Sequence, residues 1–296
     1  MVFAIFEYMF NKINTIAGLS DSIRKNLAGL YPEGEIEQLV VLIFNHLLNY
    51  SKIDIHLNLQ TSVSDEIFQK VSSVISQLKE FQPIQYIFGE TDFYGLKFTL
   101  NQHVFIPRQE TEELVHWVIS ENAAKHIRIL DIGTGSGCIA IVLARHIGNS
   151  FVDAIDISKK AIETAIINAS ANDTKVNFFK YDILGDEVFP ESVLYDIIVS
   201  NPPYVRESEK HLSGPNVTGY EPHEAIFVRD EDPFIFYKAI AAFGNKYLKK
   251  NGDIYLEINE AFGAKMKALL SDSGYHDIVL KKDINNKDRM LKAKLI

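Results

Sequence analysis

The chain has 296 residues, 47% of them hydrophobic and 23% charged, which is close to ordinary globular usage and enough for one large domain, or for an ordinary domain with a small one. Its 39 acidic residues outnumber 30 Lys plus Arg, and the net charge of -9 argues against a protein that grips nucleic acid mainly through phosphates, although a local basic patch is compatible with it. The single cysteine, Cys138, excludes an intramolecular disulfide and a cysteine metal cluster, and it fits a reducing cytoplasm.

The N-terminal part of the chain has apolar residues at helical spacing. Residues 1–10 are apolar, but they are too short to span a membrane and lack the positive start of a signal peptide, so we interpret them as the first turns of a packed amphipathic helix. A later helix is expected to open on a capping pair of Ser62 and Asp65 and to end at Pro83. The pattern predicts about four short helices and a small all-helical domain over residues 1–82.

After these helices the apolar period becomes two. Leu96, Phe98 and Leu100 alternate with polar residues, as in a half-buried strand. A turn then leads into the apolar residues 104–106. We predict that these two runs pair as a β-hairpin within a linker over residues 83–108.

The remaining part, residues 109–296, alternates between strand and helix patterns. This alternation predicts an α/β fold, with a seven-stranded, mostly parallel sheet and helices on both faces. The last two strands have no room for a helix between them and should form an antiparallel pair at one edge. The expected strands cover 128–132, 151–155, 176–179, 196–200, 253–258, 275–280 and 290–295, and the expected helices 138–147, 159–170, 234–249 and 260–272.

A glycine-rich loop follows the first strand of this sheet and opens a helix. Ligands of such sheets bind beyond the carboxyl ends of the strands, and glycines there permit tight turns and close approach of a ligand. The glycines alternate, unlike the G-x-G-x-x-G of dinucleotide-binding loops, and the pattern resembles the first motif of class I S-adenosylmethionine-dependent methyltransferases. We expect the cofactor to contact the residues of this loop: Gly133, Thr134, Gly135, Ser136 and Gly137.

Two acidic residues at strand ends support a nucleoside ligand. Asp156 ends the second strand, where a carboxylate would accept hydrogen bonds from ribose hydroxyls. Asp182 ends the third strand, within reach of an adenine amine. Either acid alone could equally be a turn or capping residue, but both stand in the expected order after the glycine loop.

The motif Asn201, Pro202, Pro203 and Tyr204 follows the fourth strand at its carboxyl end. Two prolines remove two N–H donors, so the local backbone offers carbonyl acceptors without competing donors. The Asn201 side chain adds another carbonyl, and Tyr204 offers a flat face. Together they can hold a planar NH2 group through both hydrogens, so we expect all four to bind substrate and Asn201, Pro202 and Tyr204 to be catalytic.

The chemistry that suits this motif is methyl transfer to an amide or amine nitrogen. An amide nitrogen is a poor nucleophile because its lone pair is delocalised into the carbonyl. Acceptors around its hydrogens favour a more electron-rich nitrogen as attack begins, and they are therefore complementary to the transition state. Such transfer requires no metal, and the histidines show no metal-ligand spacing. The motif alone does not separate glutamine amides from adenine.

Nearly the whole chain resembles the release factor N5-glutamine methyltransferase family (PrmC/HemK). The resemblance is carried by the motifs Gln85-Tyr86-Ile87-Phe88-Gly89, Phe93-Tyr94-Gly95, Phe105-Ile106-Pro107-Arg108-Gln109-Glu110-Thr111-Glu112, the glycine loop, Asn201 to Tyr204, Tyr220-Glu221-Pro222, and Asp283 with Asp288-Arg289.

This resemblance implies a substrate, a cofactor and separate roles for the helical and the α/β domain. The substrate would be the glutamine of the Gly-Gly-Gln tip of class I peptide chain release factors, docked by the helical domain. S-adenosylmethionine would contact the glycine loop, Asp156, Asp182, Ile183 and Asn201, although family members often carry an aromatic residue where this chain has Ile183. The segment 205–232 should partly cover the substrate site.

The segment that contains Arg108, Glu110, Thr111 and Glu112 has two interpretations. It either shapes the methionine end of the cofactor pocket or forms a capping and ion-pair cluster at a helix start. Three other functions remain open: a ribosomal-protein glutamine methyltransferase, a nucleic acid N6-adenine methyltransferase, which the acidic balance disfavours, and a nucleotide-binding module without catalysis. We expect a cytoplasmic monomer without stable nucleic acid or membrane binding.

Overall fold

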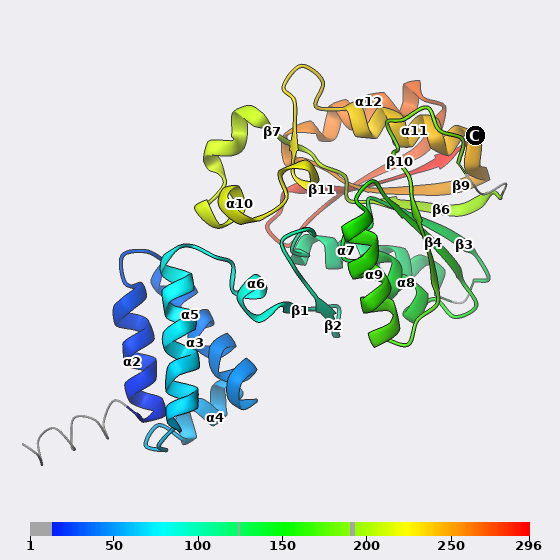
Figure 1. Ribbon diagram of the computed structural model, residues 1–296. Helices are drawn as coiled ribbons and strands as arrows, with labels where there is room; N and C mark the ends of the chain where they lie inside the picture. Colours follow the sequence, from blue (N-terminus) through cyan, green and yellow to red (C-terminus); the bar gives the residue numbers. More distant parts are fainter. Residues whose placement is uncertain (1–13, 124, 190–192) are drawn as a thin grey trace, which may run out of the picture. The chain divides into compact units, whose positions relative to one another are not determined.

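The computed structural model describes residues 14–123, 125–189 and 193–296, and the chain divides into two compact units, Met1–Phe88 and Gly89–Ile296 (Figure 1). The helix expected over residues 1–10 lies outside the described residues. In the part of the chain that is described, no helix is long and apolar enough to cross a membrane.

The first unit is helical, and its helices begin where polar side chains cap them. The Thr15 hydroxyl accepts a hydrogen bond from the Gly18 N–H, and Ser51 forms a capping box with Asp54. The cap of the last long helix is Ser64 and not Ser62 as expected, because Ser62 forms a β-bridge with Thr15 instead. The helices are α2 Ile16–Leu27, α3 Glu33–Leu48, α4 Lys52–Leu57, α5 Asp65–Lys79 and α6 Ile84–Phe88.

The first unit has a core of its own. Its largest wholly buried side chains come from α2, α3 and α5, and they share one apolar cluster. Burial of each such side chain contributes about 1.5–3 kcal/mol relative to exposure, so the faces with helical spacing explain why these helices pack together. The cluster includes Ile16, Leu19, Ile23, Leu27, Ile43, Phe44 and Leu78.

A short hairpin opens the second unit, but it differs from the predicted one. Strand β1 Glu90–Phe93 pairs antiparallel with β2 Leu96–Thr99, and residues 104–106 form no strand. The two turn residues adopt positive φ, 50° at Tyr94 and 76° at Gly95, as a two-residue turn between twisted strands requires. The sequence concealed this turn because a tyrosine rarely adopts that conformation.

The main sheet confirms the predicted fold class. Its strand order is β10-β11-β9-β6-β3-β4-β5, with β11 antiparallel to both of its neighbours and β9, β6, β3, β4 and β5 mutually parallel. The order reverses between β3 and β6, and ligands of open α/β sheets bind at such a switch point. The strands are β3 Arg128–Ile132, β4 Phe151–Asp156, β5 Val176–Lys180, β6 Tyr195–Ser200, β9 Leu248–Glu257, β10 Tyr275–Lys282 and β11 Asp288–Leu295.

Helices cover both faces of this sheet (Figure 1). Neighbouring strand residues point to opposite faces, so Ile129 and Ile197 join the core under α7, α8 and α9, while Leu130 and Ile198 join the core under α11 and α12. These helices are α7 Gln109–Asn122, α8 Cys138–His146, α9 Lys159–Ala171, α11 Ile235–Tyr247 and α12 Gly263–Asp272. Cys138 is buried in the first of these cores.

The segment after the Asn-Pro-Pro-Tyr motif is folded and not a plain loop. Its first and last pieces, β7 Val205–Arg206 and β8 Phe227–Val228, pair in parallel and close it on itself. Between them lie η1 Glu207–Leu212, α10 Pro215–Tyr220 and η2 His223–Ala225. We call residues 205–228 the covering segment.

Candidate active site

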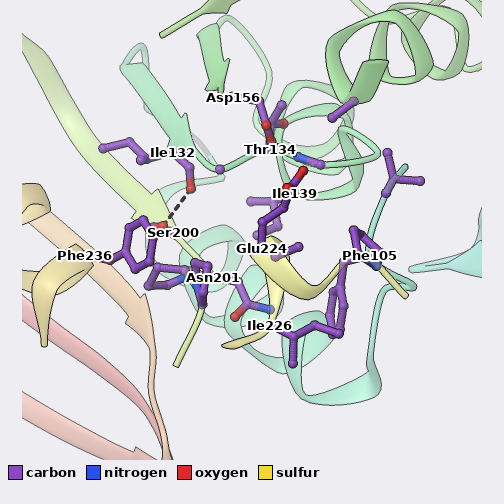
Figure 2. A pocket seen from close by; sticks show the side chains of 18 of the residues that line it. Phe105, Ile132, Thr134, Ile139, Asp156, Ser200, Asn201, Glu224, Ile226 and Phe236 are labelled. Atoms are coloured by element: carbon purple, nitrogen blue, oxygen red, sulfur yellow. Dashed lines mark hydrogen bonds between the residues drawn. The ribbon is translucent and has the colours of Figure 1, made fainter. Parts of the chain in front are cut away.

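A cavity of about 560 Å³ lies where the strands on either side of the switch point end (Figure 2). A cavity of this size is typical of a small-molecule or cofactor site. Its wall brings together most of the residues expected from the sequence: Gly133, Thr134, Gly135, Ser136, Asp156, Asp182, Ile183, Asn201, Pro202, Pro203 and Tyr204. The covering segment contributes Val205, Ser213, Val217, Pro222, Glu224, Ala225 and Ile226.

The glycine loop exposes its backbone to the cavity. Gly133 and Gly135 have φ of 75° and 55°, and a Cβ atom at either position would meet no heavy atom within 4 Å, so this backbone is open to a ligand. Gly137 differs, because it does not line the cavity. A Cβ there would lie 3.0 Å from side-chain atoms of Ala165 and Ile141, so this glycine permits close helix packing instead.

Asp156 joins the glycine loop to the end of β4. One carboxylate oxygen accepts the Gly135 N–H at 2.9 Å, and the other accepts the Ser158 N–H at 2.8 Å. Burial raises the pKa of Asp156, and these two backbone donors oppose that effect. Each oxygen keeps a lone pair, which suits acceptance of hydrogen bonds from ribose hydroxyls.

Asp182 and Ile183 lie beyond the end of β5. The Asp182 carboxylate accepts the Leu184 N–H at 2.9 Å, which holds the turn that presents Ile183 to the cavity. Ile183 packs at the edge of the core under α11 and supplies an apolar wall in place of an aromatic ring.

The Asn-Pro-Pro-Tyr motif lies beside the glycine loop because β6 pairs with β3. The Ser200 hydroxyl donates to the Ile132 carbonyl at 2.6 Å, which ties the two strand ends together (Figure 2). The Asn201 side-chain amide donates to the Thr111 hydroxyl at 3.1 Å. This contact leaves the side-chain carbonyl of Asn201 as an available acceptor.

A buried carboxylate that the sequence interpretation missed connects this motif to two other elements. Glu257, at the end of β9, accepts hydrogen bonds from the Thr111 hydroxyl at 2.7 Å and from the Tyr204 hydroxyl at 2.9 Å. Burial raises the pKa of Glu257 and holds the pKa of Tyr204 well above its usual value, so the phenol remains neutral. An acidic residue directly after the buried run Ile254, Tyr255 and Leu256 was the signal that could have revealed it.

The segment before α7 anchors the covering segment. The wholly buried Glu221 side chain accepts a hydrogen bond from the Ile106 N–H at 3.2 Å and forms an ion pair with Arg108. Glu112 accepts the Tyr94 N–H at 2.5 Å and so holds the hairpin turn. Arg108, Glu110 and Thr111 also line the cavity, so the residues around the start of α7 both form part of its wall and hold neighbouring segments in place.

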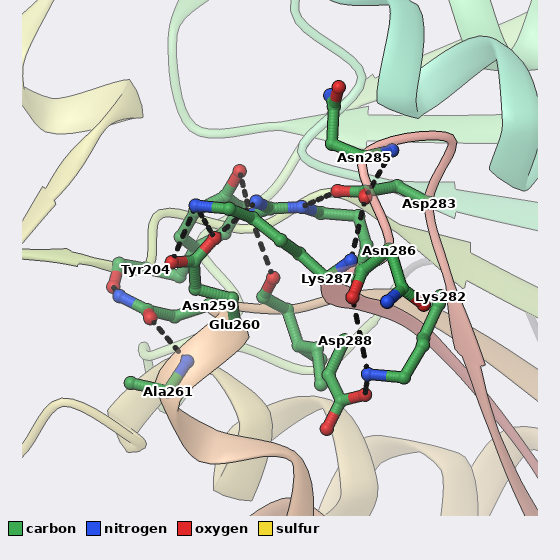
Figure 3. Close-up of polar contacts among 12 residues, drawn as sticks. Tyr204, Asn259, Glu260, Ala261, Lys282, Asp283, Asn285, Asn286, Lys287 and Asp288 are labelled. Atoms are coloured by element: carbon green, nitrogen blue, oxygen red, sulfur yellow. Dashed lines mark hydrogen bonds and ion pairs between the residues drawn. The ribbon is translucent and has the colours of Figure 1, made fainter.

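A late cluster of polar and charged residues supports Tyr204 (Figure 3), and its Arg289 itself lines the cavity. Arg289 donates to the Asp283 carboxylate at 3.1 Å and to the Ile258 carbonyl at 3.2 Å, and its guanidinium carbon lies 5.9 Å from the Tyr204 ring centroid. Asn259 donates to the Tyr204 carbonyl at 3.3 Å. These contacts connect the late residues Asp283 and Arg289 to the Asn-Pro-Pro-Tyr motif.

Comparisons with known proteins agree with this architecture. The family model of the methyltransferase small domain matches residues 111–214, and that of the PrmC N-terminal domain matches residues 23–89. The release factor glutamine methyltransferase of Flavobacterium psychrophilum is 44% identical over 271 residues, which are 90% of this chain and 94% of the relative. The enzyme of that name from Bacteroides thetaiotaomicron is 41% identical over 92% of this chain and 97% of its own length.

The chain belongs to the release factor glutamine methyltransferase family. Solved structures support the fold. A Thermus thermophilus 16S rRNA N2 G1207 methyltransferase in complex with AdoMet and guanosine has a TM-score of 0.51 at 19% identity over 70% of this chain and 50% of that one. A Pyrococcus furiosus methyltransferase has a TM-score of 0.50 at 15% identity over 78% and 98%.

As a member of this methyltransferase family, the chain is an enzyme whose methyl donor is S-adenosylmethionine. The cavity fits that cofactor on two observations. The backbone is open at Gly133 and Gly135, and the Asp156 carboxylate beside them retains acceptor capacity. Among the described residues, no group of three His, Cys, Asp or Glu side chains is arranged to hold a metal ion.

Proposed function

We propose that this protein transfers a methyl group from S-adenosylmethionine to the side-chain nitrogen of the glutamine in the Gly-Gly-Gln motif of class I release factors. The observation that carries the proposal is one cavity lined by both the glycine loop and the Asn-Pro-Pro-Tyr motif. The names of the relatives supply the substrate, since they are release factor glutamine methyltransferases.

The roles of the cavity residues follow from their positions. Gly133 to Gly137 and Asp156 would hold the cofactor together with Asp182, Ile183 and Asn201, although Gly137 acts through helix packing. The bound cofactor supplies an electrophilic methyl group on a sulfonium centre. The wall of the cavity is largely apolar, and this low dielectric strengthens the hydrogen bonds within it.

Asn201, Pro202, Pro203 and Tyr204 would position the glutamine amide. Its two hydrogens would be accepted by the Asn201 side-chain carbonyl and by backbone carbonyls of the motif, which lacks N–H donors at both prolines. These acceptors bind more strongly as the nitrogen gains positive charge, so they lower the barrier and do not merely bind substrate. Tyr204, fixed by Glu257, would provide a flat wall for the amide plane.

We further propose that the helical unit docks the body of the release factor and that the enzyme acts as a monomer without stable nucleic acid binding. The net charge of -9 supports the absence of stable nucleic acid binding. The expected cytoplasmic location stays a prediction.

The test is a labelling assay with mass mapping. The protein is incubated with methyl-labelled S-adenosylmethionine and an unmethylated class I release factor, and the modified peptide is sequenced. We expect one methyl group on the motif glutamine and none on a release factor in which that glutamine is alanine. Parallel incubations with DNA and with ribosomal proteins complete the design, and label appearing there but not on the release factor would refute the proposal.

A further inference from the structure

The side chain of Asn201 has two ends of opposite hydrogen-bonding character. Its carbonyl oxygen accepts hydrogen bonds, and its NH2 group donates them. Only the carbonyl end can hold the hydrogens of a substrate amide. If the side-chain amide were rotated by half a turn, its NH2 group would face the NH2 group of the substrate amide, and neither could accept. The proposed function therefore requires contacts that fix the orientation of the Asn201 amide.

The structure contains a chain of hydrogen bonds that reaches from Asn201 to a buried charge. The Asn201 NH2 group donates to the Thr111 hydroxyl at 3.1 Å, and that hydroxyl donates to the Glu257 carboxylate at 2.7 Å. Thr111 and Glu257 are themselves buried, with 2% and 1% exposure, so water does not compete for these contacts. The second carboxylate oxygen accepts the Tyr204 hydroxyl at 2.9 Å.

The direction of every bond in this chain follows from the carboxylate. An ionised carboxylate has no proton and can only accept. Thr111 must therefore direct its single proton at Glu257, which leaves only lone pairs toward Asn201. A lone pair can be met only by the NH2 end of Asn201, and the carbonyl end is then turned away from Thr111.

We propose that Thr111 and Glu257 are positioning residues that fix the side-chain amide of Asn201 so that its carbonyl accepts from the substrate nitrogen. The inference rests on the proposed function of Asn201. It assigns a role to Thr111, in the first turn of α7, and to Glu257 on β9, 146 positions away in the chain.

Burial opposes the ionised state that this role needs, and three neighbours of Glu257 favour it. Burial, the largest effect, raises the pKa of Glu257, and the nearby Glu110 adds to the rise. The hydrogen bonds from Thr111 and Tyr204 and the charge of Arg289 act against it and hold the carboxylate as an acceptor. A neutral amide at this position can donate as well as accept. It could donate to Thr111, and Thr111 would then donate to the Asn201 carbonyl and reverse the amide.

The test separates the hydroxyl of Thr111 from its shape. Thr111→Val keeps the volume and removes the relay, and Thr111→Ser keeps the relay. We expect the valine variant to have a kcat roughly tenfold lower than wild type. This loss is smaller than the roughly hundredfold loss from removing a group that hydrogen-bonds the reacting atoms directly. The affinities for S-adenosylhomocysteine and for the release factor should be unchanged. The serine variant should recover most of the activity, and Thr91→Val in the hairpin serves as the matched control.

Glu257→Gln provides the second variant, because it preserves volume and replaces the pure acceptor with a group that also donates. We expect it to lower kcat at least as much as Thr111→Val while S-adenosylhomocysteine binding is retained. If Thr111→Val does not bind S-adenosylhomocysteine, the kcat of Glu257→Gln alone tests the positioning role. Wild-type kcat in these variants, or equal losses for the valine and serine variants, would overturn the positioning role.

A double-mutant cycle distinguishes this inference from the proposed function. Asn201→Ala should lower kcat strongly, and adding Thr111→Val to it should cause no further loss, because the relay then has no amide to orient. A defective Asn201→Ala with a fully active Thr111→Val refutes the positioning role alone. A fully active Asn201→Ala refutes the proposed role of Asn201 and the positioning role with it.

Discussion

At the scale of single residues, the glycine loop rests on a buried acid that lies outside the proposed cofactor contacts. Asp131, in β3, is wholly buried, and one of its oxygens accepts the Thr134 hydroxyl at 2.7 Å. Burial raises the pKa of Asp131 to about 7, while the hydrogen bond from Thr134 opposes the shift. The folded protein therefore binds a proton here that the unfolded chain releases at a much lower pH.

This difference predicts a pH-dependent stability. The pKa of Asp131 is higher in the folded state than its ordinary value of 3.8, so its contribution to stability is fully present below pH 4 and is lost as the pH rises through 7. The variant Asp131→Asn has a side chain that cannot ionise at this position but can still accept from Thr134. The free energy of unfolding of the variant minus that of wild type, measured in urea, should therefore rise by about 3 kcal/mol between pH 5 and pH 8.

A control for this measurement is Asp230→Asn, at an exposed position. Its free energy of unfolding relative to wild type should change little over the same pH range, because solvent screens exposed charges. A constant difference between wild type and Asp131→Asn would mean that Asp131 does not titrate in this window.

The local parts of the candidate site were predictable from the sequence, and the distant parts were not. The glycine loop and the motif at Asn201 each occupy consecutive positions, so their chemistry is visible as a pattern of letters. Thr111 was noted only as part of a segment that either shapes the cofactor pocket or starts a helix. Its hydrogen bond to Glu257 depends on how α7 packs beside β9, and no local pattern encodes that contact.

At the scale of elements, the covering segment is held by one buried carboxylate. Glu221 accepts from the Ile106 N–H and pairs with Arg108, and both partners belong to the chain just before α7. The cavity wall on this side therefore depends on a contact between residues more than a hundred positions apart. Breaking it leaves a buried N–H and a partly buried guanidinium without their acceptor, which costs about 1–3 kcal/mol for the neutral donor alone.

We predict that Glu221→Ala loosens the covering segment while the main sheet stays intact. Hydrogen exchange should accelerate roughly tenfold at residues 215–228 and 104–108, in line with the loss of one buried acceptor, and stay unchanged in β3 and β4. Glu207→Ala, at an exposed position of the same segment, is the matched control. Unchanged exchange in Glu221→Ala would show that other contacts suffice to hold the segment.

Most elements were predicted because their patterns are strong. Strand β3 matches its expected bounds, and β9 begins at Leu248, five residues before the expected start, because polar residues precede its apolar run. The sequence analysis paired β2 with residues 104–106, which was wrong. The true partner of β2 is β1 Glu90–Phe93, which was missed because it shows no clear alternation. The turn of this hairpin depends on positive φ at Tyr94, which composition does not suggest.

At the scale of the whole molecule, strand order determines where chemistry occurs. The expected mixture of parallel strands with an antiparallel edge follows from periodicity, but the reversal between β3 and β6 does not. That reversal brings the glycine loop and the Asn-Pro-Pro-Tyr motif to one cavity. The sequence analysis placed both motifs at the carboxyl ends of strands, but it did not predict that their strands are neighbours, because strand order is a property of long-range pairing.

The division into two units predicts that cofactor binding and substrate docking are separable. The unit Gly89–Ile296 contains its own two-sided core and every residue proposed to contact the cofactor, so a fragment of residues 89–296 should fold and bind S-adenosylhomocysteine as the full chain does. The hairpin of this unit starts after residue 89 and stays complete in the fragment.

If the helical unit docks the release factor, the fragment should bind the factor at least tenfold more weakly, since the docking contacts are lost. Calorimetric titration of fragment and full chain with both ligands measures the two affinities. Equal release factor affinity would remove the docking role from the helical unit, and loss of S-adenosylhomocysteine binding would show that the second unit depends on the first.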